Sequence, residues 1–200
     1  MPTAKPPFLL SLSRHERKVI ETKDPHFDKA AMNVLEIRVQ QGSILEVDAQ
    51  VIVNAANSLG VMGGGVAGVI RRAAGAEVEG EARRHAPIAV GKAVLTSGGN
   101  TAFRGIIHAP TMPQPAMRIP EENVALATKA ALTLADERQF ESVALPGMGT
   151  GVGGVVHANA ASRMVAEIRA FQPTTLRTVF LVDVDPAMVA AWTAALQQRP

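Results

Sequence analysis

A short apolar strand that runs into a polar turn, three consecutive glycines and a helix constrains this chain more than any other segment. The segment is Val51–Gly75, with the sequence VIVNAANSLGVMGGGVAGVIRRAAG. Glycines at a helix N-terminus expose backbone N–H groups where the helix dipole is positive, which suits a phosphate or a diphosphate. The uncharged amides of Asn54 and Asn57 flank the turn. The segment therefore indicates a phosphorylated, sugar-bearing ligand rather than a metal ion or a protein partner.

A second glycine-rich turn, PGMGTGVGG, follows the apolar run Ser142–Leu145. Its alternate glycines allow successive N–H groups to point inward as an anion nest. The plainer interpretations are a tight turn at Gly63–Gly65 and a flexible surface loop at residues 147–154. We favour ligand contact, because consecutive glycines carry an ordering cost and two such turns can clamp one diphosphate from both sides. The first turn is not a Walker A loop, which needs a following Lys-Ser/Thr, nor a good dinucleotide fingerprint.

The hydrophobic pattern predicts strands that alternate with helices. Strands are expected at residues 35–40, 51–53, 93–96, 105–109, 142–145 and 178–184. Helices are expected at residues 66–74, 76–85, 121–138 and 158–171, and a last one begins at Pro186 with Asp185 as its cap. The four prolines from Pro110 to Pro120 predict a loop.

This alternation is typical of the α/β class, here a three-layer α/β/α sandwich with a mixed, mostly parallel central sheet. Ligands bind such sheets beyond the carboxyl ends of the strands, where both glycine turns fall. His108, inside the apolar strand, is expected to be a satisfied core or strand-end histidine rather than a catalytic one. Asp183 and Asp185 straddle a strand end, and capping accounts for Asp185.

Composition excludes several classes of protein. The chain has 200 residues, of which 47% are hydrophobic and 19% charged, as in a soluble globular protein. No run reaches the roughly 20 apolar residues of a membrane span. The absence of cysteine removes disulfides, thiolate catalysis and Cys-type zinc sites, and no acidic or histidine cluster offers a metal site. No secretory signal is predicted, so the cytoplasm is the expected location.

Domain organisation and charge limit the partners. We expect an N-terminal extension over residues 1–30, with a short strand or helix near residues 9–20, and one domain over residues 31–200. The net charge of +2 arises in the extension, so the remainder is neutral. The clusters Arg71–Arg72 and Arg83–His85 fit solvated helix faces, and six Phe, one Trp and no Tyr offer few platforms for bases. We expect no nucleic-acid partner and favour a monomer.

Several blocks, in order, resemble those of the macro domain family, the ADP-ribose-binding fold. VIVNAAN followed by GGGV resembles the most diagnostic block, and GKAVLTSGGN and IIHAP resemble the next two strands. ALPGMGTGVGGV resembles the second phosphate loop, and FLVDVDPAMVAAW resembles the last strand and helix. The resemblance covers roughly residues 34–196. It implies ADP-ribose or an ADP-ribosylated protein as the partner, with no cofactor and no metal.

The resemblance also implies roles for particular residues. Asn54 and Asn57 match the family's NAAN asparagines, and Asn57 would contact the distal ribose and orient it for catalysis. The loops around the diphosphate and distal ribose would be formed by Gly63, Gly64, Gly65 and Val66 and by Gly149, Thr150, Gly151, Val152, Gly153 and Gly154. Gly42, Ser43 and Ile44 match the entry to the adenine pocket, and adenine would pack on Val184, Met188 or Val189.

Three positions depart from the family's pattern. Ser43 stands where many members have an aspartate that accepts from the adenine amino group, so adenine selectivity is less assured. Ala67 stands where the MacroD-type hydrolases have an aspartate implicated in catalysis. Gly153 stands where many members place an aromatic residue against the distal ribose.

Two functions follow from the resemblance. One is an ADP-ribosyl hydrolase that acts on mono-ADP-ribosylated acidic residues or on distal-ribose esters, with a water held by the ligand's own phosphate in place of a protein base. The alternative is a non-catalytic reader of ADP-ribose, which Ala67 and Gly153 favour. A more distant alternative is RNA or poly-ADP-ribose binding through Arg71, Arg72, Arg83 and Arg84, against which the neutral charge of this region argues.

Overall fold

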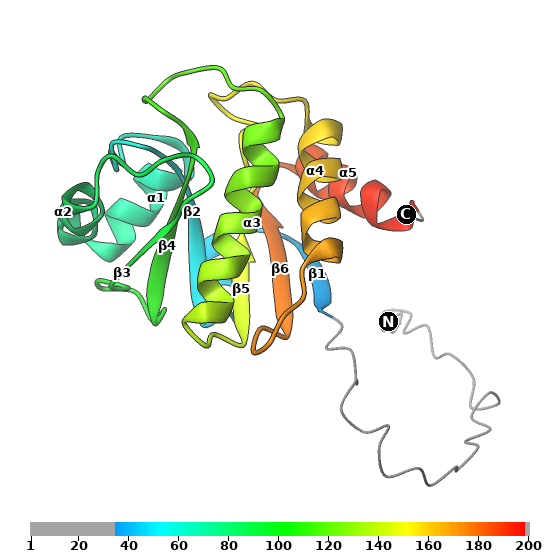
Figure 1. Ribbon diagram of the computed structural model, residues 1–200, viewed down its shortest axis with the longest axis horizontal. Helices are drawn as coiled ribbons and strands as arrows, with labels where there is room; N and C mark the ends of the chain where they lie inside the picture. The colour runs from blue at the N-terminus through cyan, green and yellow to red at the C-terminus, as the bar shows by residue number, and fades with distance from the viewer. Residues whose placement is uncertain (1–34, 199–200) are drawn as a thin grey trace, which may run out of the picture. The chain divides into compact units, whose positions relative to one another are not determined.

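A computed structural model describes residues 35–198, which form one six-stranded sheet with helices on both faces (Figure 1). The expected extension and its short element lie outside the described residues. The strands are β1 (Glu36–Gln41), β2 (Val51–Asn57), β3 (Val94–Thr96), β4 (Gly105–Met112), β5 (Ser142–Leu145) and β6 (Thr178–Asp183). The helices are the short 3₁₀ helix η1 (Ile44–Glu46) and α1 (Gly65–Ala74), α2 (Ala76–Arg84), α3 (Glu122–Glu137), α4 (His157–Ala170) and α5 (Pro186–Gln197).

The sheet has the strand order β1-β6-β5-β2-β4-β3. All neighbouring strands are parallel except β3 and β4, which are antiparallel. The carboxyl ends of β1, β6, β5, β2 and β4 therefore share one edge of the sheet. The loops that leave β4 and β5 at this edge lie at the top of Figure 1.

Alternation of side chains along the buried strands divides the core into two layers. On one face, Ile52 packs with Ile70 of α1 and Val78 of α2. On the other face, Val51 and Val53 pack in the cluster that holds the buried sides of α3, α4 and α5. Helices thus cover both faces, and the predicted three-layer sandwich with a mixed, mostly parallel sheet is confirmed.

Most predicted elements are present, but two strands are longer than predicted. β2 continues through the asparagines to Asn57, because residues 54–56 stay buried or half-buried and pair with β4. β4 continues to Met112, so the prediction that the loop begins at Pro110 is wrong. β3 pairs only with Ile106–His108 of β4. Proline is tolerated at residue 110 because no strand pairs with β4 at that point on the β3 side, so no hydrogen bond from a backbone N–H is required there.

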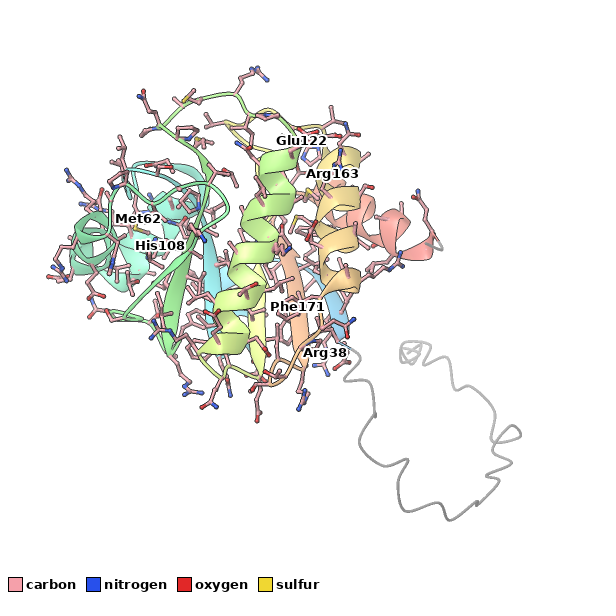
Figure 2. All side chains as sticks on the ribbon, viewed as in Figure 1. Arg38, Met62, His108, Glu122, Arg163 and Phe171 are labelled. Carbon is pink, nitrogen blue, oxygen red and sulfur yellow. The ribbon has the colours of Figure 1, made fainter. Side chains whose placement is uncertain are left out.

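The predicted start of the last helix is confirmed. Asp185 caps α5 by accepting a hydrogen bond from the backbone N of Ala187 at 2.8 Å, and Pro186 occupies the first turn. Between α3 and α4, Arg163 contacts Glu121 at 2.7 Å and Glu122 at 3.6 Å, which joins the middle of α4 to the N-terminus of α3 (Figure 2). Within residues 35–198, no helix has the length and apolar character required to cross a membrane.

A chain of buried polar side chains links β2, β4 and β3 through His108, which Figure 2 labels and which is fully buried. Asn54 Nδ2 lies 3.1 Å from His108 Nδ1, and Thr96 Oγ1 lies 3.0 Å from His108 Nε2. When Thr96 Oγ1 donates to the carbonyl of Ser97, 3.1 Å away, it accepts from Nε2–H. This assignment makes Nδ1 the acceptor for Asn54 and leaves the ring neutral. The prediction of a satisfied core histidine is confirmed.

Burial is the main reason that the pKa of His108 falls to about 4, while the nearby Glu81 opposes the shift. The folded-state pKa lies below the unfolded value of about 6.5. Between these values the unfolded chain takes up a proton and the folded chain does not. The free energy of unfolding therefore decreases as the pH falls from about 6.5 to about 4, by up to about 3 kcal/mol from this residue.

The variant His108→Gln tests this pH dependence, because glutamine cannot take up a proton. We expect the pH dependence of its stability between pH 4 and 6.5 to be shallower than that of the wild type, as measured by urea unfolding. Because both proteins share every other titrating group, the difference between the two curves isolates His108. Parallel curves would contradict the assignment of a buried neutral ring.

Candidate functional site

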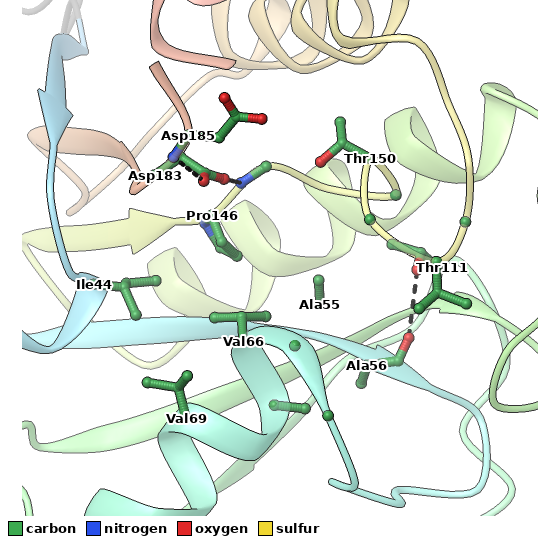
Figure 3. Close-up of a pocket in the computed structure, with 18 of the residues that line it drawn as sticks. Ile44, Ala55, Ala56, Val66, Val69, Thr111, Pro146, Thr150, Asp183 and Asp185 are labelled. Carbon is green, nitrogen blue, oxygen red and sulfur yellow. Dashed lines mark hydrogen bonds between the residues drawn. The ribbon is translucent and has the colours of Figure 1, made fainter. Parts of the chain in front are cut away.

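A cavity of about 810 Å³ lies at the carboxyl edge of the sheet (Figure 3). Each of the five mutually parallel strands contributes to its walls at or just beyond its carboxyl end. These contributions are Gly42–Ile44 after β1, Ala55–Asn57 in β2, Thr111 and Met112 in β4, Pro146 and Gly147 after β5, and Val182–Asp185 from β6. The cavity thus has a β6 end, formed by residues 42–44 and 182–185, and a β4 end, formed by residues 55–57, 111–112 and 115–116.

Asn57 organises the turn that leads from β2 to the first glycines. Its Nδ2 donates to the carbonyl of Val61 at 2.8 Å, and its Oδ1 accepts from the backbone N of Leu59 and of Val61, both at 3.2 Å. The pairing of β2 with β4 shifts register between Ala56 and Asn57, at the point where the strand leaves the sheet. Asn57 lines the cavity and keeps a second amide hydrogen for a ligand.

A second clamp holds the same turn from α2. Glu79 accepts from the backbone N of Met62 at 3.1 Å and forms an ion pair with Arg71. The bond from Met62 lowers the pKa of Glu79, and Arg71 adds to this effect while burial opposes it. Residues 57–62 are therefore fixed from both sides, immediately before the first glycine loop.

The first glycine loop, Gly63–Val66, lines the cavity at the N-terminus of α1. A Cβ built on Gly63 or Gly64 would meet no atom within 4 Å, and neither residue has a positive φ. Packing within the described chain therefore does not require glycine at these two positions. Gly65 differs, because its φ of 55° favours glycine. Open space thus lies beside the backbone of Gly63 and Gly64, at the N-terminus of α1.

The second glycine loop, residues 147–154, is closed by its own backbone. The backbone N of Val155 donates to the carbonyl of Gly149 at 3.1 Å, and the N of Gly154 donates to Gly151 at 3.1 Å. A Cβ on Gly153 would lie 2.6 Å from the carbonyl oxygen of Gly149, so no side chain fits at that position. The absence of an aromatic residue at Gly153 is thus built into the path of this loop.

Two helix N-termini at the cavity have no side-chain cap. The N-cap residues of α1 and α4 are Gly64 and Val156, and neither offers a side-chain hydrogen bond. Gly65 and His157, the first residues of the two helices, both line the cavity. Uncapped N-terminal N–H groups and the helix dipoles favour an anion at this position. Among the described lining residues there is no Lys or Arg, so this attraction comes from the backbone.

The β6 end differs because it carries carboxylates. Asp183 accepts from the backbone N of Gly147 at 3.0 Å and from the N of Asp185 at 2.9 Å, and it thereby ties β6 to the second glycine loop. Asp185 lies 3.1 Å from Nε2 of His157 at the start of α4. Figure 3 shows both carboxylates on one side of the cavity, away from Ala56 and Thr111 at the β4 end.

Most of the residues expected to contact the ligand come together in the cavity. The lining contains Ser43, Ile44, Asn57, Gly63, Gly64, Gly65, Val66, Gly149, Thr150, Gly151, Val152 and Gly153. It does not contain Asn54, which is buried in the sheet beside His108, nor Gly154 at the far end of its loop. Ala67 lines the cavity and is nearly buried. Within residues 35–198, no group of three or more His, Cys, Asp or Glu side chains could hold a metal ion.

Sequence reasoning missed part of the lining. Asp183, Asp185 and His157 border the cavity at the β6 end, and Pro115 and Ala116 border it at the β4 end. The position of Asp183 at the carboxyl end of a strand was an available signal, because ligands bind parallel sheets at that edge. His157 gave no such signal, since its place depends on where α4 begins.

Comparison with known proteins connects this geometry to a family. The family model of the Macro domain matches residues 53–164, which include both glycine loops. An uncharacterized protein of Aquifex aeolicus is 59% identical over 165 residues, covering 82% of this chain and 100% of that protein. Uncharacterized protein Rv1899c of Mycobacterium tuberculosis is 40% identical over 167 residues, covering 83% of this chain and 46% of that protein.

Solved structures have the same architecture. The Oceanobacillus iheyensis macrodomain with ADP has a TM-score of 0.74 at 28% identity, covering 83% of this chain and 92% of that chain. A mutant of that macrodomain, solved with ADPR, has a TM-score of 0.73 at 28% identity, covering 83% and 94%. A Trypanosoma brucei macrodomain in complex with ADP-ribose has a TM-score of 0.73 at 23% identity, covering 83% and 72%, and shows the shared fold. By sequence and by architecture, this chain belongs to the macro domain family.

Proposed function

We propose that the chain binds ADP-ribose, free or attached to a protein, in the cavity at the carboxyl edge of the sheet. The observation that carries the proposal is the pair of glycine loops on the two sides of that cavity, each beside an uncapped helix N-terminus. The mutant Oceanobacillus iheyensis macrodomain, solved with ADPR, supports the choice of ligand. The open space in front of Gly63 and Gly64 supports the approach of a ligand to the backbone.

The two ends of the cavity suggest the orientation of the ligand. We place the diphosphate between the glycine loops, where the N–H groups compensate its charge. The adenosine then extends to the β6 end and the distal ribose to the β4 end, where Asn57 offers its second amide hydrogen to a hydroxyl. The reverse orientation would not change the position of the phosphates, but it would leave the ribose among the carboxylates and the base beside Asn57.

We further propose that the bound ADP-ribosyl group is hydrolysed without a protein base. In this reaction a water attacks the anomeric carbon of the distal ribose, the bond to the acyl oxygen breaks, and the carboxylate of the modified residue leaves. A phosphate oxygen of the ligand accepts the proton of the water. Asn57 orients the ribose, and positioning of this kind supplies much of a rate enhancement. Ala67 offers no acidic group for this step.

The alternative is a reader that binds ADP-ribose without turnover. What favours it is the position of the acidic groups, since the carboxylates in the described lining are Asp183 and Asp185, at the β6 end. Asp183 ends β6 and Asn57 ends β2, and these strands are separated by β5. Two strand spacings amount to about 10 Å, which leaves the carboxylate of Asp183 far from a ribose bound at Asn57. The turnover measurement below distinguishes the two functions.

Binding is tested by calorimetry with ADP-ribose, ATP and NAD on the wild type and on Gly64→Glu. A Cβ added at Gly64 meets no atom within 4 Å, so we expect the fold to be retained, and the added carboxylate opposes the diphosphate. We expect ADP-ribose to bind most tightly and the variant to lose about tenfold or more in affinity, or about 1.4 kcal/mol.

The control is Gly80→Glu. Gly80 lies on α2, outside the cavity, and a Cβ added there also meets no atom within 4 Å. We expect this variant to bind ADP-ribose like the wild type. No heat and no thermal shift with ADP-ribose on the wild type would contradict the proposed function.

Turnover is tested with a peptide that carries labelled mono-ADP-ribose on glutamate, at saturating substrate. We expect the wild type to release the label and Asn57→Ala to release it at least about tenfold more slowly. That change removes both the proposed ribose contact and the hydrogen bonds that hold the turn. Affinity of the variant for ADP-ribose is measured in parallel. Binding without release above the Asn57→Ala level would refute hydrolysis and leave the reader.

A further inference from the structure

The β6 end of the cavity combines apolar walls with a fixed carboxylate. Ile44 and Val66 belong to the same apolar cluster, and both line the cavity. Val184 lines it too and is 71% exposed, so the described chain leaves this aliphatic side chain largely uncovered. Figure 3 shows Ile44 and Val66 across the cavity from Asp183. Flat apolar faces with a polar group at the edge suit a heteroaromatic ring that donates a hydrogen bond.

Asp183 lies beside Ser43, because its strand pairs with β1. Gln41 is its register partner, and the backbone N of Gly42 donates to the carbonyl of Asp183 at 2.9 Å. The hydroxyl of Ser43 accepts from the backbone N of Leu45 at 3.2 Å and caps η1. The stronger acceptor at this point of the cavity is therefore the carboxylate of Asp183 rather than the hydroxyl of Ser43.

The hydrogen bonds of Asp183 make it a rigid acceptor with spare capacity. One carboxylate oxygen accepts from Gly147 N and the other from Asp185 N. Each oxygen of an ionised carboxylate can accept a second hydrogen bond. Asp185 is committed elsewhere, with one oxygen on the first turn of α5 and the other beside His157.

We propose that Asp183 is the residue that selects the nucleobase, by accepting a hydrogen bond from the exocyclic amino group of adenine. The proposal rests on ADP-ribose binding in this cavity and names the determinant of its base specificity. A base with a carbonyl in place of the amino group would direct an acceptor at a fixed carboxylate, and buried acceptors that face each other are strongly unfavourable. A phosphate is also disfavoured at this end, because its negative charge would face the carboxylates of Asp183 and Asp185.

The test compares ADP-ribose with inosine diphosphate ribose, which carries the carbonyl, by calorimetry on the full chain. We expect the wild type to prefer ADP-ribose by about tenfold to a hundredfold. In Asp183→Asn we expect the preference to fall to about threefold or less, because an amide can both donate and accept. The ratio of the two affinities is the readout, so a general weakening of the site cancels. Ser43→Asp in the Asp183→Asn background places a carboxylate on the neighbouring strand end and should restore the preference.

The matched control is Asp48→Asn, which removes an equal charge from an exposed position outside the cavity and should leave the ratio unchanged. Equal affinities of the wild type for both ligands, or an unchanged ratio in Asp183→Asn, would overturn the inference and leave ADP-ribose binding intact. Failure of the wild type to bind either ligand would instead overturn the proposed function.

If the Asp183→Asn variant binds neither ligand, a crystal structure of the wild type with ADP-ribose tests the inference instead. A carboxylate oxygen of Asp183 within about 3.2 Å of the adenine amino nitrogen supports the inference. An amino nitrogen more than about 4 Å from both oxygens overturns it.

Discussion

The parallel alignment of five strands is the constraint on which the rest of this structure depends. Because β1, β6, β5, β2 and β4 run in the same direction, their carboxyl ends meet at one edge and their loops surround one cavity. Helices that follow β2, β5 and β6 then begin at that edge, and the positive N-terminal ends of α1 and α4 line the cavity. The two-layered core, with alternate strand residues packed on α1 and α2 or on α3, α4 and α5, holds these loops in place.

Within that frame, the cavity separates its charges along its length. The middle attracts an anion through uncapped helix ends and glycine backbone, without a Lys or Arg among the described lining residues. The β6 end is acidic and apolar, and the β4 end is neutral. A diphosphate that joins a base to a sugar matches this sequence of environments. The turn at residues 57–62, held by Asn57 and by Glu79, orders the first loop before any ligand arrives, which lowers the entropic cost of binding.

Local patterns predicted the fold well, because periodicity and caps are local signals. The strand at Ser142–Leu145 and the Asp185 cap are present as predicted. The predicted end of β4 was wrong because strand pairing, which is not a local signal, sets it. β4 extends through Pro110 because its neighbour β3 is short. The glycine loops could be predicted as part of the site because glycine runs are visible in the sequence. The turn role of Asn57 was also open to prediction, because its partners lie two and four residues along the chain. The position of Asp183 beside Ser43 could not be predicted, since it depends on register between two strands that lie far apart in the sequence.

The central claim is that backbone N–H groups of the two glycine loops bind one diphosphate. Titration of isotope-labelled protein with ADP-ribose, followed through backbone amide resonances by NMR, tests it most directly. We expect the largest shifts at Gly63–Gly65 and Gly149–Gly151, at the same ligand concentrations for both loops, and similar shifts with ADP. Shifts confined to one loop, or centred on the basic residues Arg83 and Arg84, would contradict the account.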